Sequence, residues 1–174
     1  SGTVFLARHM ELDEYRAIKR VPKTFVNYEL FRKEALILKG IRDQAIPIVY
    51  DLAEDEQYSY LIEEYLEGDS LYAQIRESGH CSSAMTIRYG IQICHLVHIM
   101  HSTMPTPVLY LYLQPKNLLL YKNTINLIDF DHAVYADEAE RLAERYGTAG
   151  CAAPEQYTGD VLDGRTDIYA IGAV

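Results

Sequence analysis

Two stretches of the sequence carry oxygen-bearing side chains at a spacing that could hold a metal ion. The first, Tyr110 to Asn117, reads YLYLQPKN, and the triplet Asp129-Phe130-Asp131 begins twelve residues after it. Asn117 offers an amide oxygen, and Asp129 and Asp131 each offer a carboxylate. Because these are hard oxygen ligands, they suit a hard cation such as Mg²⁺. The two stretches therefore supply candidate ligands for such a cation.

The N-terminal part of the chain has the pattern of a small sheet with one helix. Residues 2–8 and 15–21 are short β-type runs joined by a polar turn, which predicts a hairpin. After Asn27, a possible N-cap, apolar residues recur at helical spacing, so an amphipathic helix is expected. Two further strands are predicted at 46–52 and 58–66, joined by an acidic turn.

The composition then shifts from strand-rich to helix-rich. A short helix is expected over 71–77, and a longer one is expected to follow with Ser83 as its N-cap. An apolar, strand-like run at 125–128 precedes the Asp triplet. We therefore predict an α+β fold with a β-rich lobe over 1–66 and a mainly helical lobe over 67–174.

Taken in chain order, these motifs resemble those of the protein kinase family. The stretch from Tyr110 to Asn117 has the spacing of H-R-D-x-x-x-x-N, and Asp129 opens a triplet similar to D-F-G. Further matches to the family's motifs are Ala17-Ile18-Lys19, Gly147-Thr148, Ala153-Pro154-Glu155 and Asp167 to Gly172. The resemblance covers nearly the whole chain and implies the bilobal protein-kinase fold.

The resemblance implies ATP as the ligand and Mg²⁺ as its cation. In the family, a Lys binds the α- and β-phosphates and a Glu of the next helix holds it, and these roles fall to Lys19 and Glu34. Asn117 and Asp129 would bind Mg²⁺, with Asp131 as a further candidate ligand. The other residues implied to contact ATP are Gly2, Val4, Ala17, Glu64, Leu66 and Leu119.

The adenine base is expected at the hinge that follows the last N-lobe strand. There the Glu64 carbonyl and the Leu66 amide would face the base. This register puts Glu63 at the position before the hinge, where an apolar residue is more usual, and a buried carboxylate needs a partner. Either the register is shifted by one residue or the pocket is unusual.

The catalytic loop departs from the family's pattern. Tyr112 stands at the position of the catalytic Asp, and a phenol, with an ordinary pKa of about 10, accepts a substrate proton poorly. Gln114 replaces a Lys whose charge stabilises the γ-phosphate. Leu111 replaces the Arg that commonly receives an activation-loop phosphate, so switching by that route is not expected. Tyr110 keeps an aromatic ring in place of His, and Asp131 replaces the Gly of D-F-G, which costs backbone freedom.

The composition limits the other ligands and partners. A formal net charge of -9 argues against nucleic acid and against an anionic membrane surface, because both need clustered Lys and Arg. Three cysteines with no C-x-x-C pair indicate free thiols in a reducing compartment, and we expect a cytoplasmic protein. No uncharged apolar run approaches the roughly 20 residues of a membrane span.

A complete kinase domain extends past both ends of this sequence. The earlier glycines of its phosphate loop would precede Gly2, and further helices would follow Gly172. One of those helices supplies the family's Arg partner for the Glu of A-P-E. We therefore expect a domain truncated at both ends, in which Glu155 lacks that partner.

Three functions compete on these residues. The leading hypothesis is a pseudokinase, which binds Mg-ATP, transfers phosphate weakly or not at all, and acts through a regulatory protein partner. The second is an active serine/threonine kinase with an atypical loop, because phosphoryl transfer is largely dissociative and Asp131 could serve as a substitute base. The third is an interaction domain without nucleotide, and the retained Lys19 and Asp129 argue against it.

Overall fold

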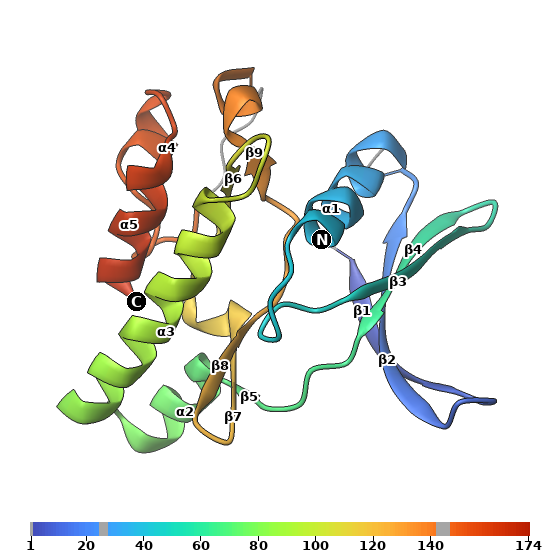
Figure 1. Ribbon diagram of the computed structural model, residues 1–174, viewed down its shortest axis with the longest axis horizontal. Coiled ribbons are helices and arrows are strands. Elements are labelled where there is room, and N and C mark those ends of the chain that lie inside the picture. Colours follow the sequence, from blue (N-terminus) through green and yellow to red (C-terminus); the bar gives the residue numbers. More distant parts are fainter. Residues whose placement is uncertain (1, 25–27, 142–146) are drawn as a thin grey trace. The chain divides into compact units, whose positions relative to one another are not determined.

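The computed structural model describes residues 2–24, 28–141 and 147–174. The chain divides into two compact units, Ser1–Leu66 and Glu67–Val174 (Figure 1). The first is rich in strands and the second contains most of the helices. The predicted α+β class is therefore confirmed.

The first unit is a four-stranded antiparallel sheet in the order β1-β2-β4-β3 with one helix against it. Its elements are β1 (Thr3–His9), β2 (Glu14–Pro22), α1 (Tyr28–Gly40), β3 (Val49–Glu54) and β4 (Tyr58–Glu64). The predicted hairpin is confirmed as β1 and β2, with Val4 opposite Lys19. The third strand begins at Val49, three residues later than expected. Asn27, the possible helix cap, lies outside the described residues.

Helix α1 forms because its apolar residues recur every three or four positions and face the sheet. Phe31, Ala35 and Leu38 make one stripe, which Ile41 continues just past the end of the helix, and all four are buried. The helix packs on β3 and β4. Burial of such a side chain contributes roughly 1.5–3 kcal/mol, so this stripe fixes the helix and every other side chain on it.

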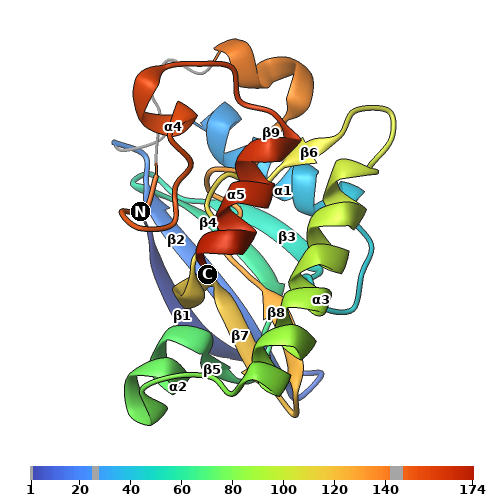
Figure 2. The ribbon, with the colours of Figure 1, turned by 90° about the vertical axis from the view of Figure 1, so that its left-hand side faces the viewer.

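The second unit contains two small antiparallel sheets, β5-β7-β8 and β6-β9, and several helices. Its elements are β5 (Asp69–Ser70), α2 (Leu71–Ser78), α3 (Ser83–His101), β6 (Val108–Leu109), η1 (Pro115–Asn117), β7 (Leu118–Tyr121), β8 (Thr124–Leu127), β9 (Val134–Tyr135), η2 (Ala136–Arg141), α4 (Glu155–Thr158) and α5 (Gly164–Ala173). Helices α3 and α5 pack together (Figure 2).

Within the described ranges, no helix is both long and apolar enough to cross a bilayer. The three cysteines are free thiols, as expected.

Helix α3 is the support for the loop that follows it. Its buried face consists of Tyr89, Ile93, Leu96, Val97 and Met100. This face packs on β6 and β8. Because the loop from 110 to 117 leaves β6 and returns through η1 and β7 toward β8, the loop is anchored to buried structure at both ends.

The start of α3 corrects one prediction. Ser82, not Ser83, is the N-cap, and its hydroxyl oxygen accepts the backbone N–H of Met85 at 3.3 Å. Both serines are good capping residues, and the extended backbone of Ser82 decides between them. The helix containing Asp167 starts at Gly164, where Asp163 and Thr166 form a capping box.

Candidate functional site

Lys19 and Glu34 meet within the first unit. Strand β2 carries Lys19 and helix α1 carries Glu34, and Nζ of Lys19 donates to Oε1 of Glu34 at 2.8 Å. The two residues are only 5% and 6% exposed. Because a buried charge is tolerated only with a partner, this ion pair fixes the Lys19 ammonium on the sheet.

One face of the sheet gathers the predicted adenine contacts around Lys19. Val4 lies directly opposite Lys19, and Ala17 lies two residues before it on β2, so all three share a face. Glu63 pairs with Ala17 and therefore also belongs to this face. Glu64 pairs with Arg16 and belongs to the other face. In the register of the structure, the Glu63 carboxylate is thus on the same face as the apolar residues Val4 and Ala17.

The remaining first-unit residues lie at the edges of this face. Gly2 lies so close to β2 that a Cβ there would be 2.6 Å from the Arg20 carbonyl oxygen, which only glycine permits. Glu64 ends β4, and its N–H donates to the Ile48 carbonyl at 2.8 Å. Leu66 follows the end of the strand and is half-buried.

In the second unit, Asp167 of α5 holds the backbone of the loop. Its carboxylate accepts the N–H of Tyr110 at 2.9 Å and the N–H of Leu111 at 2.8 Å. Nε2 of His101 lies 2.8 Å from the same carboxylate. Asp167 is 1% exposed, so these contacts stabilise its buried charge. The sequence marked Asp167 only as part of a motif, since its loop contacts are 56 and 57 residues away.

Tyr110 joins the loop to the Asp triplet. Its hydroxyl donates to the carbonyl oxygens of Ile128, at 2.6 Å, and Asp129, at 3.0 Å. Its ring packs edge-on against Phe130, with centroids 5.2 Å apart. The unusual backbone of the triplet is at Asp129, where φ is 64°. Asp131 has no positive φ, so the backbone cost expected from replacing Gly at Asp131 does not arise.

Asn117 and Asp129 come together at one end of the β7–β8 hairpin. The N–H of Ile128, the residue before Asp129, donates to the Asn117 carbonyl at 3.0 Å. The Asn117 side-chain nitrogen donates to the Tyr112 carbonyl at 3.0 Å, and this bond does not use the side-chain oxygen. Asp131 is exposed. The side chains of Asn117, Asp129 and Asp131 are therefore oxygen donors of the type that Mg²⁺ takes.

Leu119, the apolar residue implied to contact adenine, lies on β7 opposite Asn126.

The A-P-E stretch is also tied to its surroundings. Glu155 accepts a hydrogen bond from the hydroxyl of Thr166 at 2.8 Å, a neutral donor rather than the arginine that the family supplies. A capping threonine supplies the contact from within the chain. Gln156, which sequence reasoning did not single out, is 3% exposed and donates to the Leu111 carbonyl.

A family model described as the protein kinase domain matches residues 1–174. The chain belongs to the protein kinase family. A probable serine/threonine-protein kinase of Clostridium perfringens is 27% identical over 179 residues, covering 98% of this chain and 26% of that protein. The serine/threonine-protein kinase SIK2 of Gallus gallus is 29% identical, covering 99% of this chain and 22% of that protein.

A second bacterial kinase is similar to the chain to the same degree. The serine/threonine-protein kinase PknB of Mycolicibacterium smegmatis is 27% identical over 184 residues, covering 98% of this chain and 29% of that protein. This kinase chain thus spans about a quarter of the length of the curated relatives it matches.

Against the kinase motif, the residue at the catalytic Asp position makes an aromatic contact. The Tyr112 ring lies edge-on to the ring of His132, with centroids 4.3 Å apart. Gln114, at the position of the kinase Lys, is 7% exposed, and its backbone carbonyl accepts the N–H of Asn117 at 3.0 Å. His132 was missed because no local pattern predicts a contact between rings in different loops. The kinase loop is therefore ordered here by packing and hydrogen bonds.

Proposed function

We propose that this kinase domain is a pseudokinase that binds Mg-ATP and transfers phosphate weakly or not at all. The observation that carries the proposal is the buried ion pair of Lys19 and Glu34, at 2.8 Å, in a chain that has Tyr112 where kinases have the catalytic Asp. The ion pair positions an ammonium that can bind the phosphates of a nucleotide, whereas the tyrosine is a poor proton acceptor for phosphate transfer.

Nucleotide binding is supported by the groups on the Lys19 face of the sheet. An ammonium held by a carboxylate suits the α- and β-phosphates, and Val4 and Ala17 offer apolar surface beside it. The hinge backbone at Glu64 and Leu66 would supply hydrogen bonds to the base. Leu119 is a further apolar residue that the kinase resemblance assigns to adenine.

Magnesium binding is supported by the chemistry of the oxygen donors. Asn117 and Asp129 would hold the ion, and Asp131 is a further candidate ligand. When bound, Mg²⁺ would neutralise charge on the phosphates. Tyr110 and Ile128 fix the backbone around these donors, so the chain's own contribution is to hold them in place.

Weak transfer follows from the side chains of the loop. Loss of a general base typically costs 10²–10⁴-fold in rate, on the order of what Tyr112 would cost here. Gln114 carries no charge, so it cannot stabilise negative charge in the transition state as a lysine does. The Tyr112 ring is engaged in packing against His132, and the backbone carbonyl of Gln114 accepts the N–H of Asn117.

An active serine/threonine kinase is the second candidate. It is favoured by one observation, the exposed carboxylate of Asp131 two residues beyond Asp129, which could accept a proton from a protein substrate. In the pseudokinase proposal the protein partner is regulatory instead, and the setting is cytoplasmic.

Thermal unfolding of the full-length protein with and without Mg-ATP tests nucleotide binding. We expect Mg-ATP to raise the Tm, Lys19→Ala to abolish the rise, and Lys39→Ala, at an exposed position of the same unit, to leave it unchanged. EDTA should remove most of the rise. An identical Tm with and without Mg-ATP would favour the interaction domain and refute the proposal.

A further inference from the structure

Leu111 has a strained backbone inside a buried loop. Its φ is 61°, in the left-handed region that a branched side chain rarely adopts, and the residue is 7% exposed. Such strain persists only where the surroundings determine the conformation strongly. We therefore expect the contacts of Leu111 to stabilise this strained conformation.

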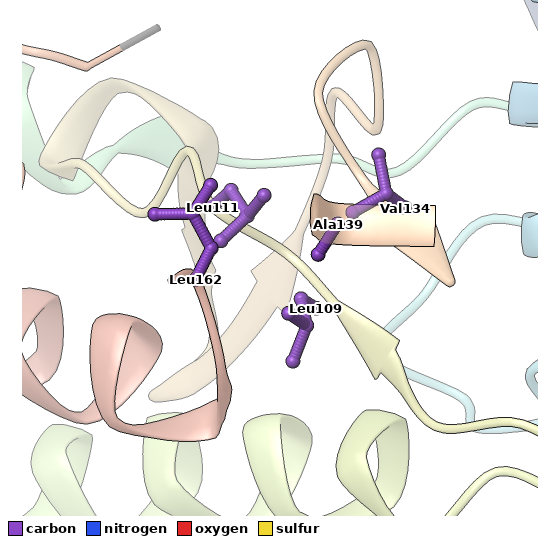
Figure 3. Packing of buried hydrophobic residues seen from close by; sticks show 5 residues of the cluster. All are labelled: Leu109, Leu111, Val134, Ala139 and Leu162. Carbon is purple, nitrogen blue, oxygen red and sulfur yellow. The ribbon is translucent and has the colours of Figure 1, made fainter. Parts of the chain in front are cut away.

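The side chain of Leu111 belongs to an apolar cluster built from three separate segments (Figure 3). The members are Leu109, Leu111, Val134, Ala139 and Leu162. Two come from β6 and the loop after it, two from β9 and η2, and one from the segment before α5. Each is at most 7% exposed, and Ala136 packs on the cluster as well. The cluster therefore joins the kinase loop to both ends of the stretch between the Asp triplet and α5.

The main chain of Leu111 is held from both sides. Its N–H donates to Asp167 at 2.8 Å, and its carbonyl accepts the side-chain N–H of Gln156 at 2.9 Å. The side-chain oxygen of Gln156 in turn accepts the N–H of Ala153 at 3.0 Å. Gln156 thus bridges the loop and the A-P-E stretch with both of its polar atoms.

The start of the same stretch is held by backbone contacts. Strands β6 and β9 pair antiparallel, with Leu109 opposite Val134. The N–H of Ala136 donates to the Pro107 carbonyl at 2.8 Å. These bonds place Val134 and Ala139 where the Leu111 side chain meets them, so packing and pairing act together.

We infer that Leu111 and Gln156 form a lock that holds two described parts of the activation segment, residues 133–139 and 153–156, on the loop from 110 to 117 without a phosphate. An arginine at this position would need an anion, whereas Leu111 is satisfied by its apolar neighbours, among which a phosphate would lose its hydration at a large cost. Leu111 and Gln156 are positioning residues. The lock concerns regulation, rests on contacts within residues 67–174, and would stand even if Mg-ATP binding failed.

A direct consequence concerns Thr148, a threonine that the kinase resemblance places in the activation segment. Its carbonyl accepts the N–H groups of Cys151 and Ala152, both at 2.9 Å, so the turn there is closed by backbone bonds. The lock predicts that Thr148→Ala and Thr148→Glu leave the order of residues 133–139 unchanged.

Hydrogen exchange measured by mass spectrometry on the full-length protein tests the lock. Leu111→Ala and Gln156→Met should speed exchange in peptides covering 108–113 and 133–139 by at least about tenfold, because local opening becomes easier. Leu111→Met, which keeps an apolar side chain, should stay within about twofold. Ile91→Ala, at an exposed position of α3, is the matched control and should change nothing.

Either of two results overturns the inference. One is unchanged exchange at 133–139 in both Leu111→Ala and Gln156→Met, and the other is at least about tenfold slower exchange there in Thr148→Glu than in the natural protein. If Leu111→Ala does not fold, Gln156→Glu decides, since it keeps an acceptor for Ala153 and removes the donor to Leu111. The Mg-ATP shift of Tm in the same samples reports separately on the proposed function.

Discussion

The two units treat the charged positions of the kinase motifs in opposite ways. In residues 1–66, Lys19 and Glu34 are kept, buried and joined at 2.8 Å. In residues 67–174, the positions of the motif's Arg, Asp and Lys hold Leu111, Tyr112 and Gln114, and the side chains of Leu111 and Tyr112 make packing contacts instead. The comparison teaches that a loop can stay well ordered after its chemical groups are replaced.

The largest effect is expected from breaking the ion pair of the first unit. Lys19→Met leaves the Glu34 carboxylate buried without the ammonium, which should lower the free energy of unfolding by about 3–5 kcal/mol. Urea unfolding measures the loss. Lys39→Met is the control, and as an exposed substitution it should change stability by less than about 0.5 kcal/mol. Equal stability of Lys19→Met and the control would show that the buried ion pair does not stabilise the first unit.

The second unit should be most sensitive at Asp167. Asp167→Ala leaves the N–H groups of Tyr110 and Leu111 buried without their acceptor, at a cost of about 2–5 kcal/mol. Asp137→Ala, at an exposed position, is the control. Urea unfolding combined with hydrogen exchange at 108–113 locates the loss in the loop. A loss of stability without faster exchange there would show that Asp167 stabilises something other than the loop.

A smaller effect is expected from the Tyr110 hydroxyl. Tyr110→Phe keeps the ring contact with Phe130 and removes the donor to the carbonyls of Ile128 and Asp129, which should cost about 1–2 kcal/mol. Thermal unfolding measures it, with Tyr169→Phe as an exposed control. If Tyr110→Phe were neutral, the loop would be held to the triplet by ring packing alone.

The smallest effect is expected at the first turn of α5, the helix that carries Asp167. Asp163→Ala removes the N-cap and should cost about 1 kcal/mol near neutral pH. A hydrogen bond from Arg165 lowers the pKa of Asp163. Because the folded pKa is depressed, the carboxylate's contribution is present above the unfolded pKa, about 3.9, and is lost as pH falls through the folded pKa. Urea titrations of both proteins at several pH values should therefore converge in acid.

The fold was predictable where a pattern repeats over many residues. The hairpin of β1 and β2 and the stripe of α1 follow from alternating and helical spacing. Strands of two residues, such as β6 and β9, were not predictable because they are too short to show a period. Ser82 and Ser83 are equally good caps by type, so only the backbone angles distinguish them.

The candidate site divides in the same way. Lys19 and Glu34 could be named because a motif fixes their spacing along the chain. The contacts of Asp167 and Gln156 with the loop span 45 to 57 residues, and no local pattern predicts them. Leu111 could be recognised as a substitution, but its apolar partners became known only from the fold.

The central claim, retained binding with lost transfer, is tested most directly by the rate of γ-phosphate transfer from Mg-ATP in the full-length protein. Kinases turn over at about 1–100 s⁻¹, and loss of both the base and the Lys charge should slow this at least about 10⁴-fold, so we predict saturable Mg-ATP binding with turnover below about 10⁻² s⁻¹. Tyr112→Asp should raise that rate at least about tenfold. Turnover of about 1 s⁻¹ or faster with Tyr112 in place would contradict the account.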